Sequence, residues 1–136
     1  MPKVQPLAFE CTSTQSLEDL VEKAKAVSTG DNFVLLIDNK EDAIGRILPA
    51  YLNSYIKHKE GNMRSESLQI EMLLFLAGTF KISKAIERYG AKRSSNFLLI
   101  GNKVELLRSF AKNNGIKLVR KLKLGISEKF MPEIEK

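Results

Sequence analysis

The sequence is poor in the residues from which catalytic and metal sites are most often built. It contains one histidine, one cysteine and no tryptophan among 136 residues. Zinc sites usually combine several His and Cys ligands, so one of each predicts no metal site. Cys11 has no partner for an internal disulfide, and its apolar neighbours favour an inert packed thiol over a nucleophile. His58 lies in the polar segment KHKEGN, which is more typical of a solvated surface than of a catalytic centre.

Long apolar runs and nucleotide loops are also missing. No stretch approaches the length that spans a bilayer, and no basic segment leads into an apolar run at the N-terminus, so we expect an intracellular, cytoplasmic protein. The segment GTFKISK, residues 78–84, lacks the second glycine of a phosphate loop. The acidic pairs at 18–19 and 41–42 begin predicted helices, where the helix dipole accounts for them. The sequence therefore predicts neither an enzyme nor a cofactor.

Positive charge is the main departure from ordinary composition. The formal net charge is +6, and basic residues collect at 81–93 and at 112–129. Lysine and arginine neutralise phosphates, so a polyanionic partner is one interpretation. The other is a solvated basic surface without a partner. Net charge by itself does not distinguish nucleic acid, membrane surface and acidic protein.

Strand and helix patterns alternate along a chain of single-domain length, so residues 1–136 are predicted to form one domain. Strands are predicted at 4–11, 33–37, 96–101 and 116–124. Pro6 places the first of them at an edge of the sheet or at a bulge, and we favour the edge. The alternation of strands and helices favours a compact α/β (α+β) domain, in which a small mixed or antiparallel sheet of about four strands is flanked by helices.

The helices carry several start and stop signals. Ser16 is a candidate cap for a helix that continues toward Gly30, and Pro49 should kink or divide a helix over 43–55. Asn102 and the glutamate three residues later suggest a capping pair for the helix that follows the third strand. A short terminal helix with Phe130 and Ile134 is the last predicted element.

The most informative segment is 65–90, where an almost wholly apolar helix is followed by a short basic one. Residues 68–77 leave hardly any polar face, which predicts a helix covered on several sides. Gly78 ends this helix, and a second helical period then places Ile82, Ala85, Ile86 and Tyr89 on one face. We therefore expect a buried helix that holds a positively charged helix at the surface.

This segment resembles a known family. The resemblance is carried by a strand-like FLLIG and, before it, by the order Ser67, Glu71, Gly78, Ile82, Ala85, Ile86, Gly90. This order is similar to the TPRKB family, the small kinase-binding subunit of the KEOPS complex, and the similarity is most specific over 63–101. Archaeal members tend to have glutamine just before the isoleucine, where this chain has Lys81, so a ligand contact there would be ionic.

The resemblance implies a function without catalysis. KEOPS adds a threonylcarbamoyl group to the adenosine next to the anticodon of certain tRNAs, and other subunits carry out the chemistry. The family implies binding to the PRPK-type kinase-like ATPase subunit and, for archaeal members, binding of the tRNA 3′ CCA tail. The alternative is a pure protein regulator of that ATPase with no RNA site of its own.

Candidate RNA-binding residues combine cations, hydroxyls and an apolar platform, as single-stranded RNA sites do. They are Lys57, Lys59, Arg64, Ser65, Ser67, Lys81, Ile82 and Lys84. The alternative is that the serines only cap a helix and that Ile82 belongs to the core.

Candidate partner-binding residues are apolar and are drawn from segments where a small subunit can expose anchors. They are Phe80, Tyr89, Phe130 and Met131. For the last two, the alternative is that they close the core.

Overall fold

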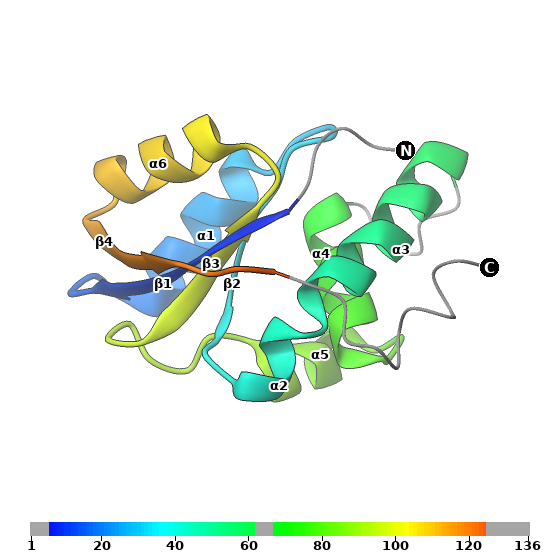
Figure 1. Cartoon of the computed structure of the whole chain (residues 1–136), viewed down its shortest axis with the longest axis horizontal. Coiled ribbons are helices and arrows are strands. Elements are labelled where there is room, and N and C mark those ends of the chain that lie inside the picture. The colour runs from blue at the N-terminus through cyan, green and yellow to red at the C-terminus, as the bar shows by residue number, and fades with distance from the viewer. Residues whose placement is uncertain (1–5, 62–66, 125–136) are drawn as a thin grey trace.

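The computed structural model describes residues 6–61 and 67–124 (Figure 1). In chain order the described elements are β1 (Leu7–Ser13), α1 (Leu17–Val27), β2 (Val34–Asp38), α2 (Glu41–Ile44), α3 (Ile47–Glu60), α4 (Leu68–Ala77), α5 (Ile82–Tyr89), β3 (Phe97–Gly101), α6 (Val104–Asn113) and β4 (Ile116–Lys121). The predicted terminal helix with Phe130 and Ile134 lies outside the described residues.

The strands form one antiparallel sheet in the order β2-β3-β1-β4. This confirms the predicted α/β domain with a small sheet of four strands. The predicted edge position of the first strand is wrong, because β1 pairs with β3 on one side and β4 on the other. Pro6 lies just before Leu7, where β1 begins, so its missing N–H removes no bond from the ladder.

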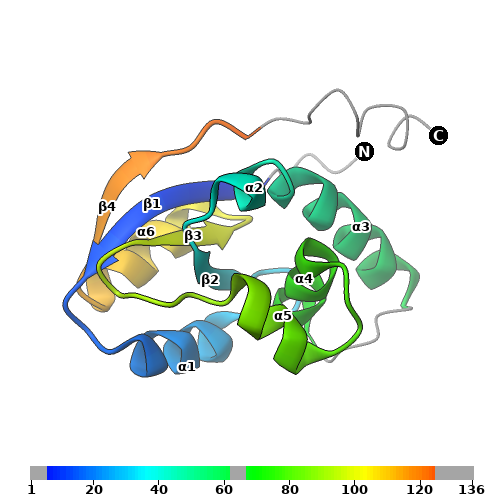
Figure 2. The same cartoon turned by 90° about the horizontal axis from the view of Figure 1, so that it is seen from below.

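Helices cover both faces of the sheet (Figures 1 and 2). On one face, Phe97 and Leu99 of β3 belong to a core cluster that includes residues of α1 and α6. On the other face, Leu98 and Ile100 belong to a second cluster with α2, α3, α4 and α5. Successive side chains of a strand point to opposite faces, so a strand covered on both sides is apolar at every position.

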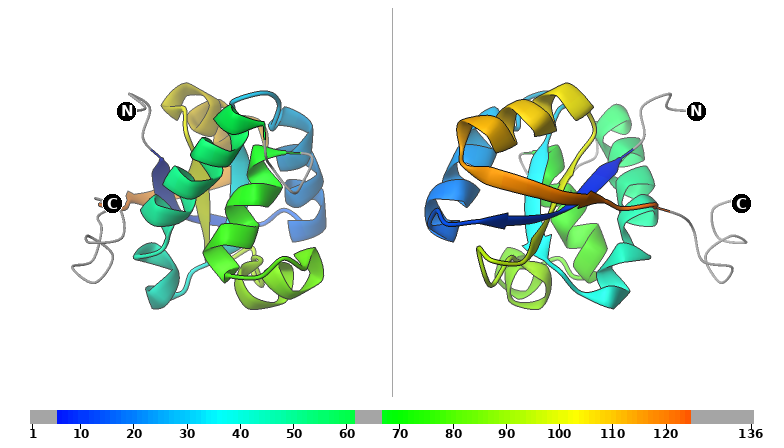
Figure 3. Two further views of the ribbon diagram at one scale, coloured as in Figure 1. Left: turned by 90° about the vertical axis from the view of Figure 1, so that its right-hand side faces the viewer. Right: turned by 60° about the vertical axis from the view of Figure 1, so that its left-hand side comes forward.

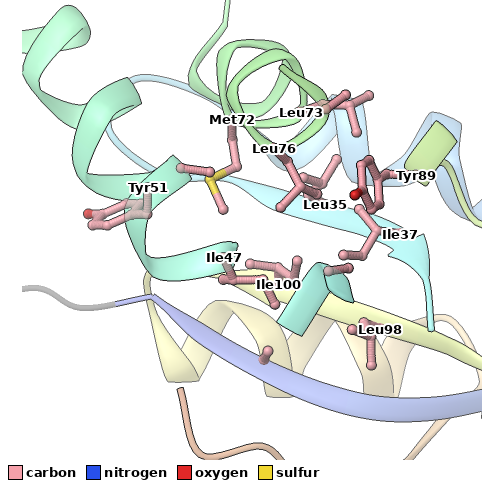
Figure 4. Packing of buried hydrophobic residues seen from close by; sticks show 14 of the residues in the cluster. Leu35, Ile37, Ile47, Tyr51, Met72, Leu73, Leu76, Tyr89, Leu98 and Ile100 are labelled. Carbon is pink, nitrogen blue, oxygen red and sulfur yellow. The ribbon is translucent and has the colours of Figure 1, made fainter. Parts of the chain in front are cut away.

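Helix α4 is the buried helix that the sequence predicts. Leu68, Met72 and Leu76 are almost fully buried, and Figure 4 shows Met72 and Leu76 pointing toward β2, α3 and the centre of the core. The side chain of Gln69 is also buried, and its Nε2 donates to the backbone oxygen of Val34 at 2.5 Å. Apolar packing and a hydrogen bond to the edge strand therefore fix α4 on the sheet.

Of the two predicted helix caps, one has the right position and the other is wrong. Ser16 is the N-cap residue of α1, as predicted, but its side chain makes no capping hydrogen bond. The N-cap of α6 is Lys103 rather than Asn102. The Asn102 side chain instead accepts a hydrogen bond from the Phe33 N–H at 3.2 Å and donates to the Asp31 carbonyl. It therefore ties the end of β3 to the loop before β2, a use that competes with capping.

The predicted break in the helix over 43–55 exists, but it lies ahead of Pro49. Helix α2 ends at Ile44 and α3 begins at Ile47, so Pro49 falls in the first turn of α3. Backbone N–H groups in a first turn lack a helical acceptor, and proline is tolerated there. The chain breaks at Gly45 and Arg46 instead.

Gly101 tests how tightly the sheet and α6 pack. A Cβ atom at this position would lie 2.6 Å from Leu107 Cδ2 and 2.8 Å from the Phe33 carbonyl oxygen. Gly101→Ala should therefore lower the free energy of unfolding by roughly 1–3 kcal/mol. Gly45→Ala is the matched control, because a Cβ atom added there would have no neighbouring atom within 4 Å and the φ of Gly45 is −72°.

Urea unfolding of the two variants and the original chain measures the difference. Gly45→Ala should be neutral or more stable by up to about 1 kcal/mol, because alanine reduces the entropy of the unfolded chain. Equal unfolding free energies for the two variants would contradict close packing at Gly101.

Candidate functional site

The candidate site lies at the corner where α4 turns into α5. Helix α4 ends at Gly78, which adopts a left-handed conformation with φ 67° and donates its N–H to the Leu74 carbonyl at 2.9 Å. Glycine adopts this conformation without the steric cost that a Cβ atom brings. Thr79 and Phe80 then lead to Lys81, the N-cap of α5.

Helix α5 is fastened to the core through one face. Ala85 and Tyr89 are buried, and the Tyr89 hydroxyl donates to the Asp42 carboxylate of α2 at 2.7 Å. This hydrogen bond lowers the pKa of Asp42, while burial and the same bond raise the pKa of Tyr89. Arg88 Nη1 donates to the Ala77 carbonyl at the end of α4 at 2.9 Å. The start of α5 is thus presented on a well-anchored helix.

The corner also exposes apolar side chains beside the buried face of α5. Phe80, Ile82 and Ile86 are 74%, 45% and 51% exposed. The sequence pattern groups the two isoleucines with Ala85 and Tyr89 on one face, and its alternative for Ile82 is a core position. These four residues do share one side of α5, but Ala85 and Tyr89 are covered and the two isoleucines are not, so the core alternative for Ile82 is wrong. Ile82 and Ile86 lie four residues apart, so they are neighbours on the helix surface.

Two lysines flank these apolar residues. We define the α5 surface as Phe80, Lys81, Ile82, Lys84 and Ile86, all of which are exposed. Lys81 and Lys84 are three residues apart and share a side of the helix that differs from the isoleucine side. Neither lysine forms an ion pair within the described part of the chain.

A hollow of about 240 Å³ adjoins the α5 surface. Its lining residues are Glu71, Leu74, Phe75, Gly78, Thr79 and Phe80. The lining is mainly apolar, apart from the buried Glu71 and the Thr79 hydroxyl, which accepts the Lys81 N–H at 3.2 Å. A flat apolar group could therefore enter beside Phe80.

Other cations near α5 have structural partners. Lys92 Nζ donates to the Ile86 and Glu87 carbonyls at 3.1 and 2.6 Å, at the C-terminal end of α5. Arg88 satisfies a terminal carbonyl of α4 in the same way. Cations are favoured at helix C-termini, where backbone carbonyls lack helical partners. The basic segment 81–93 therefore combines capping residues with the two lysines of the α5 surface.

The other predicted RNA-binding residues that the structure describes lie toward the far end of α4. Lys57 and Lys59 are in the last turn of α3, and Ser67 caps the start of α4 by accepting the Ile70 N–H at 3.2 Å. A ten-residue helix is about 15 Å long, so this group and the α5 surface are separated by the length of α4. Arg64 and Ser65 lie outside the described residues.

The predicted partner-binding residues also divide. Phe80 is on the surface, whereas the ring of Tyr89 is in the core, where it leaves little area for a partner (Figure 4). Phe130 and Met131 lie outside the described residues. Of the two predicted partner-binding residues that the structure describes, Phe80 exposes a large side chain and Tyr89 does not.

Cys11 and His58, the residues with the most reactive side chains, serve structure. Cys11 is buried, and burial raises the pKa of its thiol to about 12, so it is not a thiolate near neutrality. His58 Nε2 lies 2.5 Å from Asp31 Oδ1, and Lys59 Nζ lies 3.5 Å from Asp31 Oδ2. His58 therefore joins the end of α3 to the loop before β2. The sequence predicts a solvated side chain for His58 and gives no sign of this contact.

Several residues that position the site have no local sequence signal. Arg46 Nη1 donates to the Leu76 carbonyl at 3.2 Å, and its guanidinium carbon lies 5.8 Å from the centre of the Tyr89 ring. Asp42 and Asp31 likewise meet partners that are distant in the chain. Pairing across such separations depends on the fold, so spacing in the sequence does not reveal it.

Comparison with protein families gives one match. The model of the family described as kinase binding protein CGI-121 matches residues 44–129. The chain belongs to the CGI-121 family. The match covers α3, α4, α5, α6 and both later strands, and it confirms the resemblance that the segment 63–101 carries.

A search of curated proteins found no match to this CGI-121 family chain. Within its described residues, no helix combines the length and apolar character needed to cross a membrane.

The Asp31 pair gives this CGI-121 family chain a testable pH dependence. The hydrogen bond from His58, with Lys59 nearby, lowers the pKa of Asp31. A carboxyl with a lowered folded-state pKa stabilises the fold above its unfolded pKa, and this contribution is lost as pH falls through the folded pKa. Asp31→Asn should therefore lower stability near pH 6, and its difference from the original chain should shrink below about pH 4.

Thermal melting across this pH range measures the effect. Glu60→Gln is the control, because Glu60 is exposed at the same end of α3 and forms no ion pair with any residue in 6–61 or 67–124. A pH-independent difference between Asp31→Asn and the original chain would show that the pair does not contribute.

Proposed function

We propose that this CGI-121 family chain is a non-catalytic accessory subunit of the KEOPS tRNA-modifying complex. In this role it binds the PRPK-type kinase-like ATPase subunit and recruits tRNA through the 3′ CCA tail. The family match supports the kinase partner. The tRNA part is supported by the family resemblance of residues 63–101 and by the chemistry of the α5 surface. The proposed role needs no cofactor and places the chain in the cytoplasm.

The observation that carries the proposal is the exposure of apolar side chains on an otherwise anchored helix. Ile82 and Ile86 lie side by side on α5, while Ala85 and Tyr89 of the same helix are covered. Protein interfaces commonly centre on a few apolar or aromatic anchors that a polar rim surrounds. The isoleucine side of α5 fits such an anchor for the kinase-like subunit, so we assign Ile82 to this contact in preference to RNA.

The lysine side and the hollow fit a single-stranded RNA end. Sites for single strands combine cations that follow the phosphates with apolar or aromatic groups on which bases stack. Lys81 and Lys84 provide the cations, and Phe80 stands beside the mainly apolar hollow of about 240 Å³. Lys81 replaces the glutamine that archaeal relatives tend to have, so this contact would be ionic.

A regulator that binds the ATPase and no RNA is the second candidate. It is favoured by the separation of Lys57 and Lys59 from the α5 surface and by the ion pair that Lys59 already forms with Asp31. In that case the two lysines of α5 would form the polar rim of the protein interface. The two candidates differ in whether the tRNA tail contributes to binding.

Trimming the tRNA tail tests the RNA part of the proposal. The full chain should bind intact tRNA at least about tenfold more tightly than tRNA without CCA, because stacked bases each contribute on the order of 1–3 kcal/mol. Lys81→Glu/Lys84→Glu should abolish this difference. The control, Lys23→Glu/Lys25→Glu, reverses two exposed lysines of α1 and should preserve it.

Fluorescence anisotropy in moderate salt measures these affinities. Equal binding of intact and trimmed tRNA by the original chain would reject tail recognition and leave the regulator as the function.

Replacing an isoleucine of α5 tests the kinase-like partner. Ile86→Asp should weaken binding to the kinase-like subunit of the same organism by tenfold or more. Loss of an interface anchor typically costs about 2 kcal/mol or more of binding free energy. The fold should persist because Ile86 is exposed. Val119→Asp is the matched control, since Val119 is 53% exposed on β4.

Co-purification followed by calorimetry gives the affinities. If Ile86→Asp and Val119→Asp bind the partner equally well, the interface does not include the isoleucine side of α5.

A further inference from the structure

A second basic region lies outside the proposed site. Residues 102–124 contain seven lysines and arginines and a single carboxylate, Glu105, which give a net charge of +6. This equals the formal net charge of the whole chain. In the fold these residues form α6, β4 and the segments next to them. The sequence pattern indicates basic residues at 112–129, and the proposed function uses none of them.

The fold brings three of these lysines to one hollow. Lys103 at the start of α6 and Lys121 and Lys123 at the end of β4 line a depression of about 690 Å³. Glu105 also lines it, so the cations outnumber the carboxylate three to one. Helix α6 lies alongside β4, the edge strand of the sheet (Figure 3, right).

Two further cations, Arg108 and Lys112, lie on α6 beyond this hollow. The guanidinium carbon of Arg108 lies 5.9 Å from the centre of the Phe9 ring, and Phe9 is the cross-strand partner of Lys121. Lys112 lies one helical turn beyond Arg108 on the same side of α6. From Lys103 to Lys112 the helix rises about 14 Å. We define the α6–β4 surface as Lys103, Arg108, Lys112, Lys121 and Lys123.

These cations are available for a ligand. All five are exposed, and within residues 6–61 and 67–124 the four lysines make no hydrogen bond or ion pair. The nearby ion pair joins Arg120 to Glu10 at 3.0 Å, and it does not use a residue of this surface. Successive side chains of a strand point to opposite faces of the sheet, so Arg120 and Lys121 point to different faces.

The composition of the surface favours phosphates over a protein. A stable protein interface normally needs apolar or aromatic anchors. Among the described residues of α6 and β4, Val119 is the one large apolar side chain that is exposed. The α5 surface, by contrast, has three such side chains and lies among the helices on the opposite face of the sheet (Figure 2). A cluster of cations without apolar anchors matches a polyanion such as a phosphate backbone.

We propose that the α6–β4 surface binds the phosphate backbone of RNA independently of the RNA 3′ end. The proposal rests on the RNA-binding part of the proposed function, since charge complementarity defines a polyphosphate and tRNA is the polyphosphate proposed above. Backbone contacts position an RNA without reading its sequence. The α6–β4 surface thus adds affinity for the body of the RNA, and the α5 surface recognises the tail.

Charge neutralisation with a matched control tests this assignment. Lys103→Gln/Lys121→Gln removes one cation from α6 and one from β4. Lys23→Gln/Lys25→Gln removes two exposed cations from α1 and leaves both proposed surfaces intact. The binding of full-length chains to intact tRNA, to tail-trimmed tRNA and to polyglutamate is titrated over a series of salt concentrations, and melting temperatures confirm that each variant is folded.

The proposal predicts that Lys103→Gln/Lys121→Gln weakens binding to intact and trimmed tRNA by the same factor, roughly tenfold. It also predicts that the slope of log K against log salt falls by about 1.5, because each phosphate contact contributes roughly 0.7–0.9. Lys23→Gln/Lys25→Gln should change both quantities much less.

The outcomes separate this proposal from the proposed function. Equal effects of the two double variants on tRNA would overturn it, even if the tail still contributes to affinity. If Lys103→Gln/Lys121→Gln loses affinity for polyglutamate but not for tRNA, the proposal is also overturned, and the surface is assigned to an acidic protein. Trimming the tail can also leave the affinity unchanged while Lys103→Gln/Lys121→Gln still weakens binding. In that case the α6–β4 surface binds RNA and the proposed recognition of the tail is wrong.

Discussion

The burial of α4 is the constraint on which the rest of the structure depends. Its apolar side chains pack against the sheet and α3, and Gln69 attaches it to the edge of β2. At its other end, Arg46 and Arg88 satisfy the carbonyls of Leu76 and Ala77. A helix covered in this way cannot shift without exposing a large apolar area, and burial of such area is the dominant favourable term in folding. Helix α5 is connected to α4 by a short turn and is therefore held in place.

This arrangement separates two kinds of exposed surface. On one face of the sheet, the α5 surface combines apolar side chains with lysines, a mixture suited to a protein partner and to stacked bases. On the other, the α6–β4 surface is cationic and has almost no exposed apolar side chains. Apolar anchors give short-range, geometry-dependent binding, whereas a cluster of cations attracts over longer distances and its attraction weakens with salt. The fold thus offers specific and general contacts on different helices.

Much of the fold could be predicted from local patterns. The apolar run of α4, the stop at Gly78 and the strand FLLIG all rest on composition and spacing over a few residues, and the structure contains each of them. Sequence periodicity groups Ile82 and Ile86 with Ala85 and Tyr89, but it cannot show that only the latter pair is covered. That depends on α2 and on Asp42, which is 47 residues from Tyr89 in the chain. The wrong cap at Asn102 has the same cause, since its side chain bonds to residues before β2.

The central claim is that the corner between α4 and α5 receives the RNA 3′ end. The most direct measurement is a titration of the isotopically labelled full chain with a short single-stranded RNA ending in CCA, followed by NMR chemical shifts. A strand of the same composition that ends in ACC serves as the control. We expect shifts at Phe80, Lys81 and Lys84 with the CCA strand and much smaller ones with the control. Unchanged signals at these residues, or equal shifts with both strands, would contradict the claim.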